Sequence, residues 1–121
     1  MSAKPPASIE RIDKPWGHEI IWAKTDHYVA KILFVKAGES LSLQYHQKKL
    51  ETMYFESGEC QVETGPDESH LRSVQFKSGD VFHIPVGILH RLKAISDCRI
   101  FEVSTPHLDD VVRLRDNYGR S

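Results

Sequence analysis

The amino-acid sequence predicts an all-β fold in a single domain. Short apolar runs, rich in β-branched and aromatic residues, alternate with clusters of Gly, Pro, Asp and Ser at intervals of roughly ten residues, which is typical of β-sandwiches and barrels. Before residue 106, no stretch of about eleven residues or more carries apolar residues at the helical period. The 121 residues are enough for one hydrophobic core without disulfide bonds. We therefore expect one sandwich or barrel.

The two ends of the chain differ from this pattern. Residues 1–8 are expected to form a flexible leader, because their two consecutive prolines resist regular pairing and they offer little apolar surface. The domain is then expected to span residues 9–121. In the tail after residue 106, Asp109 and Asp110 can cap one helical turn, but the following VVRL fits a strand equally well. The type of this element stays open.

Turn residues mark the boundaries of the expected strands. A Pro-bounded turn at Trp16 and Gly17 precedes the first strand, which ends at residue 22. Two further runs flank a polar turn at 47–50, within the stretch 38–58. The remaining strands are expected at residues 28–35, 60–64, 71–76, 81–84, 91–94 and 99–103.

Charge and composition exclude several classes of protein. Sixteen basic and 17 acidic residues give a net charge of -1, so neither a nucleic acid nor an anionic membrane surface is expected as a partner. The N-terminus lacks the apolar segment of a signal peptide, and no run reaches transmembrane length, which predicts a cytoplasmic protein. Cys60 and Cys98 have neither CxxC spacing nor a secretory context, so we expect reduced, buried thiols.

Three potential metal ligands occur within the stretch 38–58. Gln44 and His46 are two residues apart and therefore share one face of an extended strand. Glu51 opens the next apolar run, after the polar turn. If the two runs pair as neighbouring strands, the three side chains converge on one point. An amide oxygen, an imidazole nitrogen and a carboxylate then form a donor set that suits a divalent metal.

A second stretch, GDVFHIPVGILH, supplies a candidate fourth ligand. Five residues separate Gly79 from Pro85, one separates Pro85 from Gly87, and two separate Gly87 from His90. The glycines allow tight turns and the proline ends a strand, so His90 is held at the start of the next strand by a rigid turn. This position suits a metal ligand.

The spacing of both stretches resembles the two motifs of the cupin superfamily. In the first motif, Gly38, Gln44, His46, Glu51 and Gly58 follow the cupin spacing, with Gln in place of the first His. The second motif runs from residue 79 to 90 and has Ala at position 94, where cupins usually have Asn. Four blocks resemble more narrowly the isomerase domain of type II mannose-6-phosphate isomerases: KPWGHE at 14–19, LSLQYH at 41–46, IPVGILHRL at 84–92 and DDVVRLRDNYGR at 109–120.

The resemblance implies a fold, a metal and a reaction class. The fold is a double-stranded β-helix, or jelly roll, and one divalent ion per subunit (Zn, Mn, Fe or Ni) is held in its interior by Gln44, His46, Glu51 and His90. The implied function is a sugar or sugar-phosphate isomerase that works by metal-assisted proton transfer, with a sugar phosphate as its small-molecule substrate. The chain departs from the isomerases at residues 46–53, HQKKLETM, where they usually read HHHRAEHW. Lys49 thus replaces their Arg.

The proton-transferring base and the phosphate-binding residues stay open between several candidates. His18, Lys49 and His83 are candidates for the base. Cationic donors suit phosphate oxygens, and Arg120 matches the closing YGR of the isomerases. The other candidates for the phosphate are Lys31, Lys49, Arg91 and Arg113.

Two alternative functions and an assembly state are also predicted. His46, Glu51 and His90 alone form the two-His, one-carboxylate set of iron-dependent oxygenases. The altered turn at 46–53 is instead compatible with a non-catalytic sugar-binding cupin. Because a jelly roll of this size leaves sheet edges and an apolar outer face to cover, we expect a homodimer.

Overall fold

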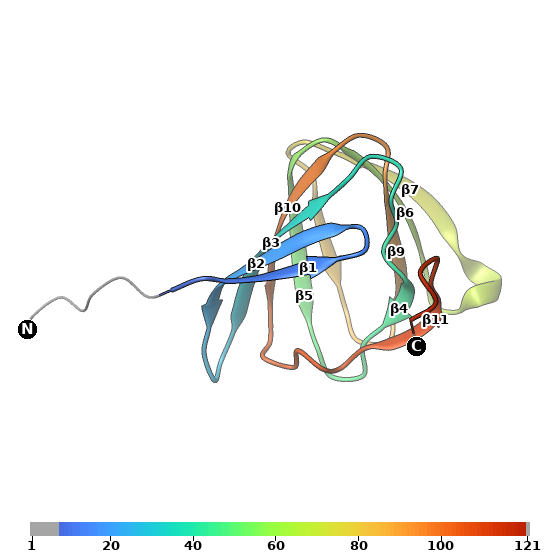
Figure 1. Cartoon of the computed structure of the whole chain (residues 1–121). Helices are drawn as coiled ribbons and strands as arrows, with labels where there is room; N and C mark the ends of the chain where they lie inside the picture. The colour runs from blue at the N-terminus through green and yellow to red at the C-terminus, as the bar shows by residue number, and fades with distance from the viewer. Residues whose placement is uncertain (1–7, 121) are drawn as a thin grey trace, which may run out of the picture.

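The computed structural model describes residues 8–120, which form two antiparallel sheets packed face to face (Figure 1). The expected leader lies outside these residues, apart from Ser8, which is exposed. The six-stranded sheet has the order β1-β2-β3-β10-β5-β8, and the five-stranded sheet has the order β11-β4-β9-β6-β7. From β3 onward the chain crosses repeatedly from one sheet to the other, as in a jelly roll. The all-β prediction is confirmed.

The strands are short and are joined mostly by tight turns. A single 3₁₀ turn, Glu68–His70, lies between β6 and β7. The strands are β1 (Glu10–Lys14), β2 (Gly17–Lys24), β3 (Val29–Val35), β4 (Leu43–Tyr45), β5 (Glu51–Ser57), β6 (Glu59–Gly65), β7 (Arg72–Lys77), β8 (Val81–Ile84), β9 (Leu89–Ala94), β10 (Cys98–Ser104) and β11 (Val112–Arg115). The expected strands lie within or overlap these elements, with shifts of one or two residues at several ends.

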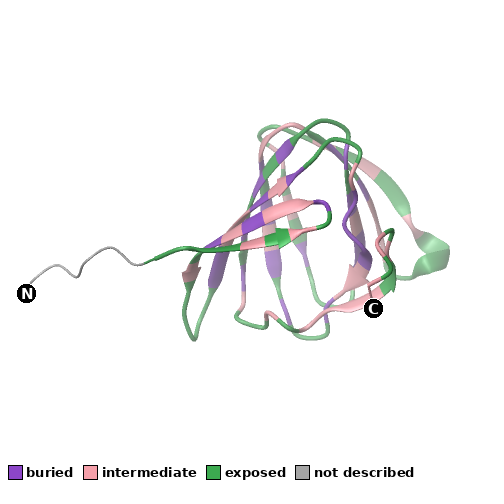
Figure 2. Cartoon of the chain, in the orientation of Figure 1, coloured by how far each residue is buried: buried purple, intermediate pink, exposed green. Residues whose placement is uncertain are grey.

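Alternation along the strands places the core between the two sheets (Figure 2). In β10, every second residue from Cys98 to Ser104 is buried and the residues between them are exposed. The core fills the end of the barrel where Phe55, Met53 and Ile100 are almost fully inaccessible to solvent. Charged side chains continue the same inward rows toward the other end, so the interior changes from apolar to polar along the strands.

One strand at the edge of each sheet was not fixed by the sequence pattern. β1 was not expected as a strand, because its sequence ERIDK has a single apolar residue; it pairs with β2 at the edge of the six-stranded sheet. The tail contributes β11, which pairs with β4. The strand alternative for VVRL is therefore the one observed.

The expected roles of the glycine turns and of the cysteines agree with the structure. Gly79 and Gly87 have φ angles of 95° and 83°, a region that side chains disfavour, and they frame the turns on either side of β8. Cys60 and Cys98 are both free and buried.

Within residues 8–120, no helix is long and apolar enough to cross a membrane.

Candidate metal centre

His46, Glu51 and His90 meet in the interior of the barrel. His46 directly follows β4, Glu51 opens β5 and His90 is the second residue of β9. Each offers one ligand atom, and the three atoms lie within 4.8 Å of one another. Glu51 Oε1 is 3.1 Å from His90 Nε2 and 3.5 Å from His46 Nε2. All three side chains are buried.

The sheet arrangement that brings them together differs from the one expected. β4 and β5 do not pair: β4 lies in the five-stranded sheet beside β9 and β11, and β5 lies in the six-stranded sheet between β10 and β8. The turn at 47–50 carries the chain from one sheet to the other. His46 and Glu51 therefore face each other across the barrel.

The orientation of both imidazoles leaves their Nε2 atoms available to a cation. His90 Nδ1–H donates to the carbonyl of Ile88 over 3.0 Å, and His46 Nδ1–H donates to the carbonyl of Asp110. These bonds place the lone pairs of the neutral rings on Nε2. Neither Nε2 atom nor Glu51 Oε1 makes a hydrogen bond of proper geometry, although all three are buried. Three converging acceptors without donors fit a divalent cation.

The second oxygen of Glu51 has a different partner. Glu51 Oε2 accepts from Lys49 Nζ at 2.9 Å. Burial by itself would raise the pKa of Glu51, but contacts with His46 and His90 and the charge of Lys49 outweigh it and hold the pKa far below its ordinary value. Glu51 is therefore a carboxylate at neutral pH, as a metal ligand must be.

Metal binding is expected to weaken as the pH falls through the neutral range. Burial would lower the pKa of His46, but Glu51 and the carbonyl of Asp110 outweigh it and raise the pKa above the ordinary 6.5. Protons therefore compete with a cation for Nε2 already above that pH, and the competition grows on acidification. Zn²⁺ titrations against a chelator from about pH 8 to pH 5.5 test this; an affinity that is constant across the range contradicts it.

Asp110, which lies in the tail, organises the turn that carries His46 and Lys49. Its carboxylate accepts hydrogen bonds from three consecutive backbone N–H groups, those of Gln47, Lys48 and Lys49, at 3.1, 2.6 and 2.9 Å. These bonds outweigh the effect of burial and lower the pKa of Asp110. Together with its carbonyl, which accepts from His46, they make Asp110 a support of the metal centre.

Gln44, the fourth expected ligand, lies beside the other three. It is on β4, directly opposite His90 on β9, and it lines the same cavity as His46. Its Oε1 accepts a 3.4 Å hydrogen bond from Ser42 Oγ. Coordination by Gln44 stays a prediction.

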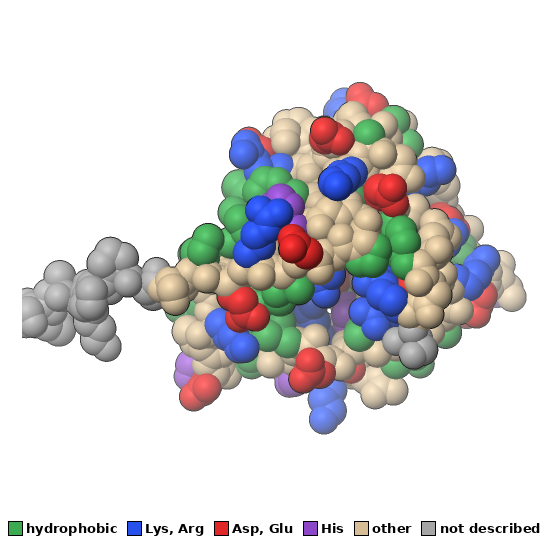
Figure 3. Space-filling view, viewed as in Figure 1, with side chains coloured by type: hydrophobic (Ala, Val, Ile, Leu, Met, Phe, Trp, Pro, Cys, Tyr) green, Lys and Arg blue, Asp and Glu red, His purple; other side chains and the backbone are tan. Residues whose placement is uncertain are grey.

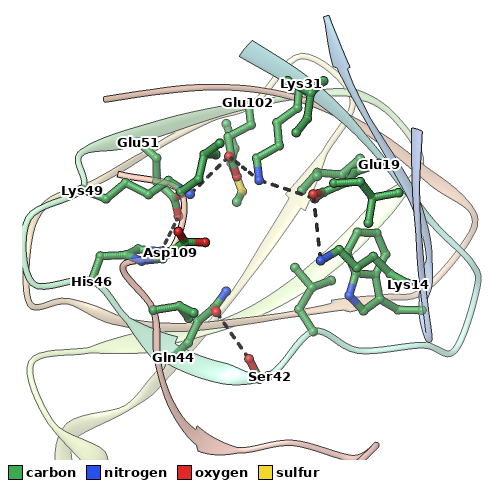
Figure 4. Close-up of a pocket in the computed structure, with 18 of the residues that line it drawn as sticks. Lys14, Glu19, Lys31, Ser42, Gln44, His46, Lys49, Glu51, Glu102 and Asp109 are labelled. Atoms are coloured by element: carbon green, nitrogen blue, oxygen red, sulfur yellow. Dashed lines mark hydrogen bonds and ion pairs between the residues drawn. The ribbon is translucent and has the colours of Figure 1, made fainter. Parts of the chain in front are cut away.

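The cavity in front of the metal centre has a volume of about 330 Å³ and a polar wall. In Figure 3, Lys and Arg side chains flank a hollow on this face of the molecule. Figure 4 shows that one wall carries charges of alternating sign from neighbouring strands of the six-stranded sheet. In order, the row is Lys14 on β1, Glu19 on β2, Lys31 on β3, Glu102 on β10, Lys49 and Glu51.

The structure separates the other candidate residues into two groups. Those that line the cavity are Lys31, Lys49, Arg113 and Arg120. Arg120 is held there by Asp116, with its Nε and Nη2 atoms 2.9 and 3.0 Å from the two carboxylate oxygens. The remaining three, His18, His83 and Arg91, are not among the lining residues of this cavity.

Each of these three side chains has a partner elsewhere. His18 stacks on Phe34, with ring centroids 4.4 Å apart. His83 is exposed and its Nδ1 lies 2.9 Å from Thr52 Oγ1. Arg91 Nη2 donates to Glu63 Oε1 over 2.7 Å. The structure therefore does not bring them to the metal centre.

Sequence reasoning missed two of the three acidic residues in the charged row. Glu102 and Glu19 are buried, yet neither was singled out. The alternation contained the information: Glu102 shares its strand face with Cys98 and Ile100, and Glu19 shares its face with Ile21. A charged residue on an otherwise apolar face marks an inward-pointing charge.

Comparison with known families and proteins identifies the family of the chain. Residues 5–116 match the family model "Mannose-6-phosphate isomerase C-terminal". The chain is 31% identical over 116 residues to the xanthan biosynthesis protein XanB of Xanthomonas campestris, and 30% identical over 112 residues to a mannose-1-phosphate guanylyltransferase of Escherichia coli. These matches cover 92% and 88% of this chain, but 24% and 22% of the two relatives, so the chain spans about a quarter of their length.

Similar solved structures establish the architecture. KdgF from Halomonas sp. superposes with a TM-score of 0.70 at 22% identity, covering 83% of this chain and 90% of that protein. A Bacillus subtilis oxalate decarboxylase, studied for its Mn(II) centres, superposes with a TM-score of 0.74 at 20% identity, covering 87% of this chain and 30% of that protein. Both are cupins. The chain therefore belongs to the mannose-6-phosphate isomerase C-terminal family and folds as a cupin jelly roll.

Proposed function

We propose that the protein is a metal-dependent aldose–ketose isomerase acting on a sugar phosphate. The observation that carries the proposal is the convergence of three buried, unpaired acceptor atoms, from His46, Glu51 and His90, at one end of a cavity lined by cationic side chains. The family match supports the reaction class, and the Escherichia coli relative is a mannose-1-phosphate guanylyltransferase, whose name includes a sugar phosphate.

The residues that would hold the ion are His46, Glu51 and His90, with Gln44 as a fourth. This donor set is compatible with Zn, Mn, Fe or Ni. The Mn(II) centres of the structurally similar oxalate decarboxylase support the presence of an ion in this fold. When bound, the ion would polarise the carbonyl and hydroxyl oxygens of the sugar.

Proton transfer between neighbouring carbons requires a group inside the cavity. Of the three bases predicted from the sequence, Lys49 lies there. Burial opposes its charge, but Glu102 and Glu51 outweigh burial and raise its pKa, so Lys49 is a cation that suits the stabilisation of a developing oxyanion. We assign the proton transfer to Glu102, a buried carboxylate on the cavity wall whose Oε2 lies 3.5 Å from Lys49 Nζ and 3.7 Å from Lys31 Nζ. Burial raises the pKa of Glu102, which favours its accepting a proton.

The phosphate is assigned to the cations around the cavity. Arg120 and Arg113 come from the C-terminal segment and Lys31 comes from the opposite sheet, so together they border the cavity from two sides. Arg120 is pre-oriented by Asp116, and part of its side chain remains accessible. Arg91, which pairs with Glu63 outside the cavity, is not included.

The reaction predicts exchange of the hydrogen at C2 of mannose 6-phosphate with solvent. The metal-loaded protein is incubated in D₂O with a panel of hexose phosphates, and exchange is followed by NMR. Replacing Glu102 with Gln is expected to reduce exchange by about 10²–10⁴-fold while metal binding is retained, because the proton acceptor is removed and the ligands are not. Glu63→Gln, at a partly exposed position outside the cavity, is the matched control.

Other outcomes would favour the two alternatives. Oxygen consumption by the iron-loaded protein in the presence of substrate, without exchange, would identify an oxygenase that uses the two-His, one-carboxylate set. Saturable binding of a sugar without exchange under any metal would identify a binding protein. Either result contradicts the isomerase proposal.

We also propose a homodimer that covers the outer face of the six-stranded sheet. Large apolar side chains are exposed there: Tyr54 on β5 lies opposite Phe101 on β10, with ring centroids 6.2 Å apart, and Val103 follows on the same strand. Light scattering at micromolar concentration is expected to give the mass of two chains, and Phe101→Asp is expected to reduce it to one. A monomeric unmodified protein would contradict the proposal.

A further inference from the structure

We propose that Lys49, anchored by Glu102, is a positioning residue that restricts Glu51 to a single metal-ligating oxygen and so keeps coordination positions open for substrate. The inference rests on the metal centre of the proposed function, but not on the isomerase reaction. It concerns a contact that the ligand trio alone does not explain: the buried ammonium group of Lys49, which lies between Glu102 and Glu51 in the charged row (Figure 4).

The two oxygens of Glu51 face different groups. Oε1 faces the two Nε2 atoms, at 3.1 and 3.5 Å, and has no hydrogen bond. Oε2 lies 2.9 Å from Lys49 Nζ, which is the distance of a charge-assisted hydrogen bond. A cation held by Oε1 and both imidazoles therefore competes with a fixed ammonium for Oε2. Because the cation and the ammonium group repel each other, Oε1 binds the cation and Oε2 stays with Lys49.

Lys49 is held in place both at its backbone and at the end of its side chain. Its backbone N–H donates to Asp110 Oδ2 over 2.9 Å. Its Nζ atom lies 3.5 Å from Glu102 Oε2, and 6% of the side chain is exposed to solvent. Glu102 is itself positioned by Lys31, its direct neighbour across β10 and β3, at 3.7 Å. The ammonium group therefore cannot swing into solvent away from Glu51.

Stability alone does not account for this arrangement. Buried ion pairs lose so much hydration that apolar residues of similar volume are often equally or more stabilising. A catalytic metal, however, needs fewer protein ligands than its full coordination number, because substrate oxygens must enter. Monodentate Glu51 leaves such positions free. Without Lys49, Oε2 would be free to bind the same ion.

The test uses Co²⁺, whose visible absorption weakens as its coordination number rises. Replacing Lys49 with Met is expected to leave one Co²⁺ bound per chain, with an affinity no weaker than before, and to lower the intensity of the visible band because Oε2 joins the coordination shell. Lys48→Met, which removes an exposed charge from the same turn, is expected to leave the spectrum unchanged.

A second variant guards against unfolding. Lys49→Met leaves Glu102 without one of its cations, whereas the double variant Lys49→Met, Glu102→Gln removes one buried charge of each sign and should show the same weaker band. An unchanged spectrum in the folded variants, or loss of Co²⁺ binding, overturns the inference. A crystal structure of the Co²⁺-loaded unmodified protein tests the inference independently. If both oxygens of Glu51 bind the ion in that structure, the inference is overturned. None of these measurements depends on isomerase activity.

Discussion

Replacing Glu51 with Gln is expected to abolish tight binding of a divalent metal and to destabilise the protein. The substitution removes the only carboxylate of the ligand trio and also leaves the Lys49 ammonium without its 2.9 Å partner in the interior. Breaking a buried ion pair from one side costs about 3–5 kcal/mol. Metal content after dialysis and urea unfolding of the metal-free protein measure the two effects separately.

Glu63→Gln provides the matched control for this experiment. Glu63 also pairs with a cation, Arg91, at 2.7 Å, but the pair lies outside the cavity and is partly exposed. Its loss is expected to change the free energy of unfolding by about 1 kcal/mol or less and to leave metal content unchanged. If Glu51→Gln retains a full complement of metal, the assignment of the centre fails.

Replacing Asp110 with Ala is expected to weaken metal binding by about 10–100-fold, although Asp110 is not a ligand. Its carboxylate accepts three consecutive N–H groups of the turn between His46 and Glu51. Without these bonds the turn loosens, and the imidazole of His46 and the ammonium of Lys49 lose their fixed positions. Chelator competition at constant pH measures the dissociation constant.

The neighbouring Asp109→Ala is the control, because it removes a carboxylate from the same segment but none of the bonds to the turn. It is expected to leave the dissociation constant within a factor of about two, since the ligands and their supports are untouched. Equal losses in the two variants would show that overall charge near the cavity, rather than support of the turn, determines the affinity.

Much of the fold was predictable because strand alternation and turn residues are local properties. The glycines at 79 and 87 and the apolar runs identified most strands, and the alternation in β4 placed Gln44 and His46 on the same cavity wall. β1 escaped prediction because an edge strand with little burial needs few apolar residues. His83 and His18 were offered as bases because sequence shows the type of a residue, whereas the face of its strand decides whether it reaches a cavity.

The sequence by itself determined the family, most of the strands and the identity of the three convergent acceptors, because motif spacing and alternation are local properties of the chain. The tertiary structure decided which strands meet. β4 and β5 face each other from opposite sheets instead of pairing, and Asp110 supports a turn more than 60 residues away. Five adjacent strands, together with the turn that carries Lys49, align charges of alternating sign. These relations depend on long-range packing, since residues distant in sequence become neighbours only when the two sheets close around one interior.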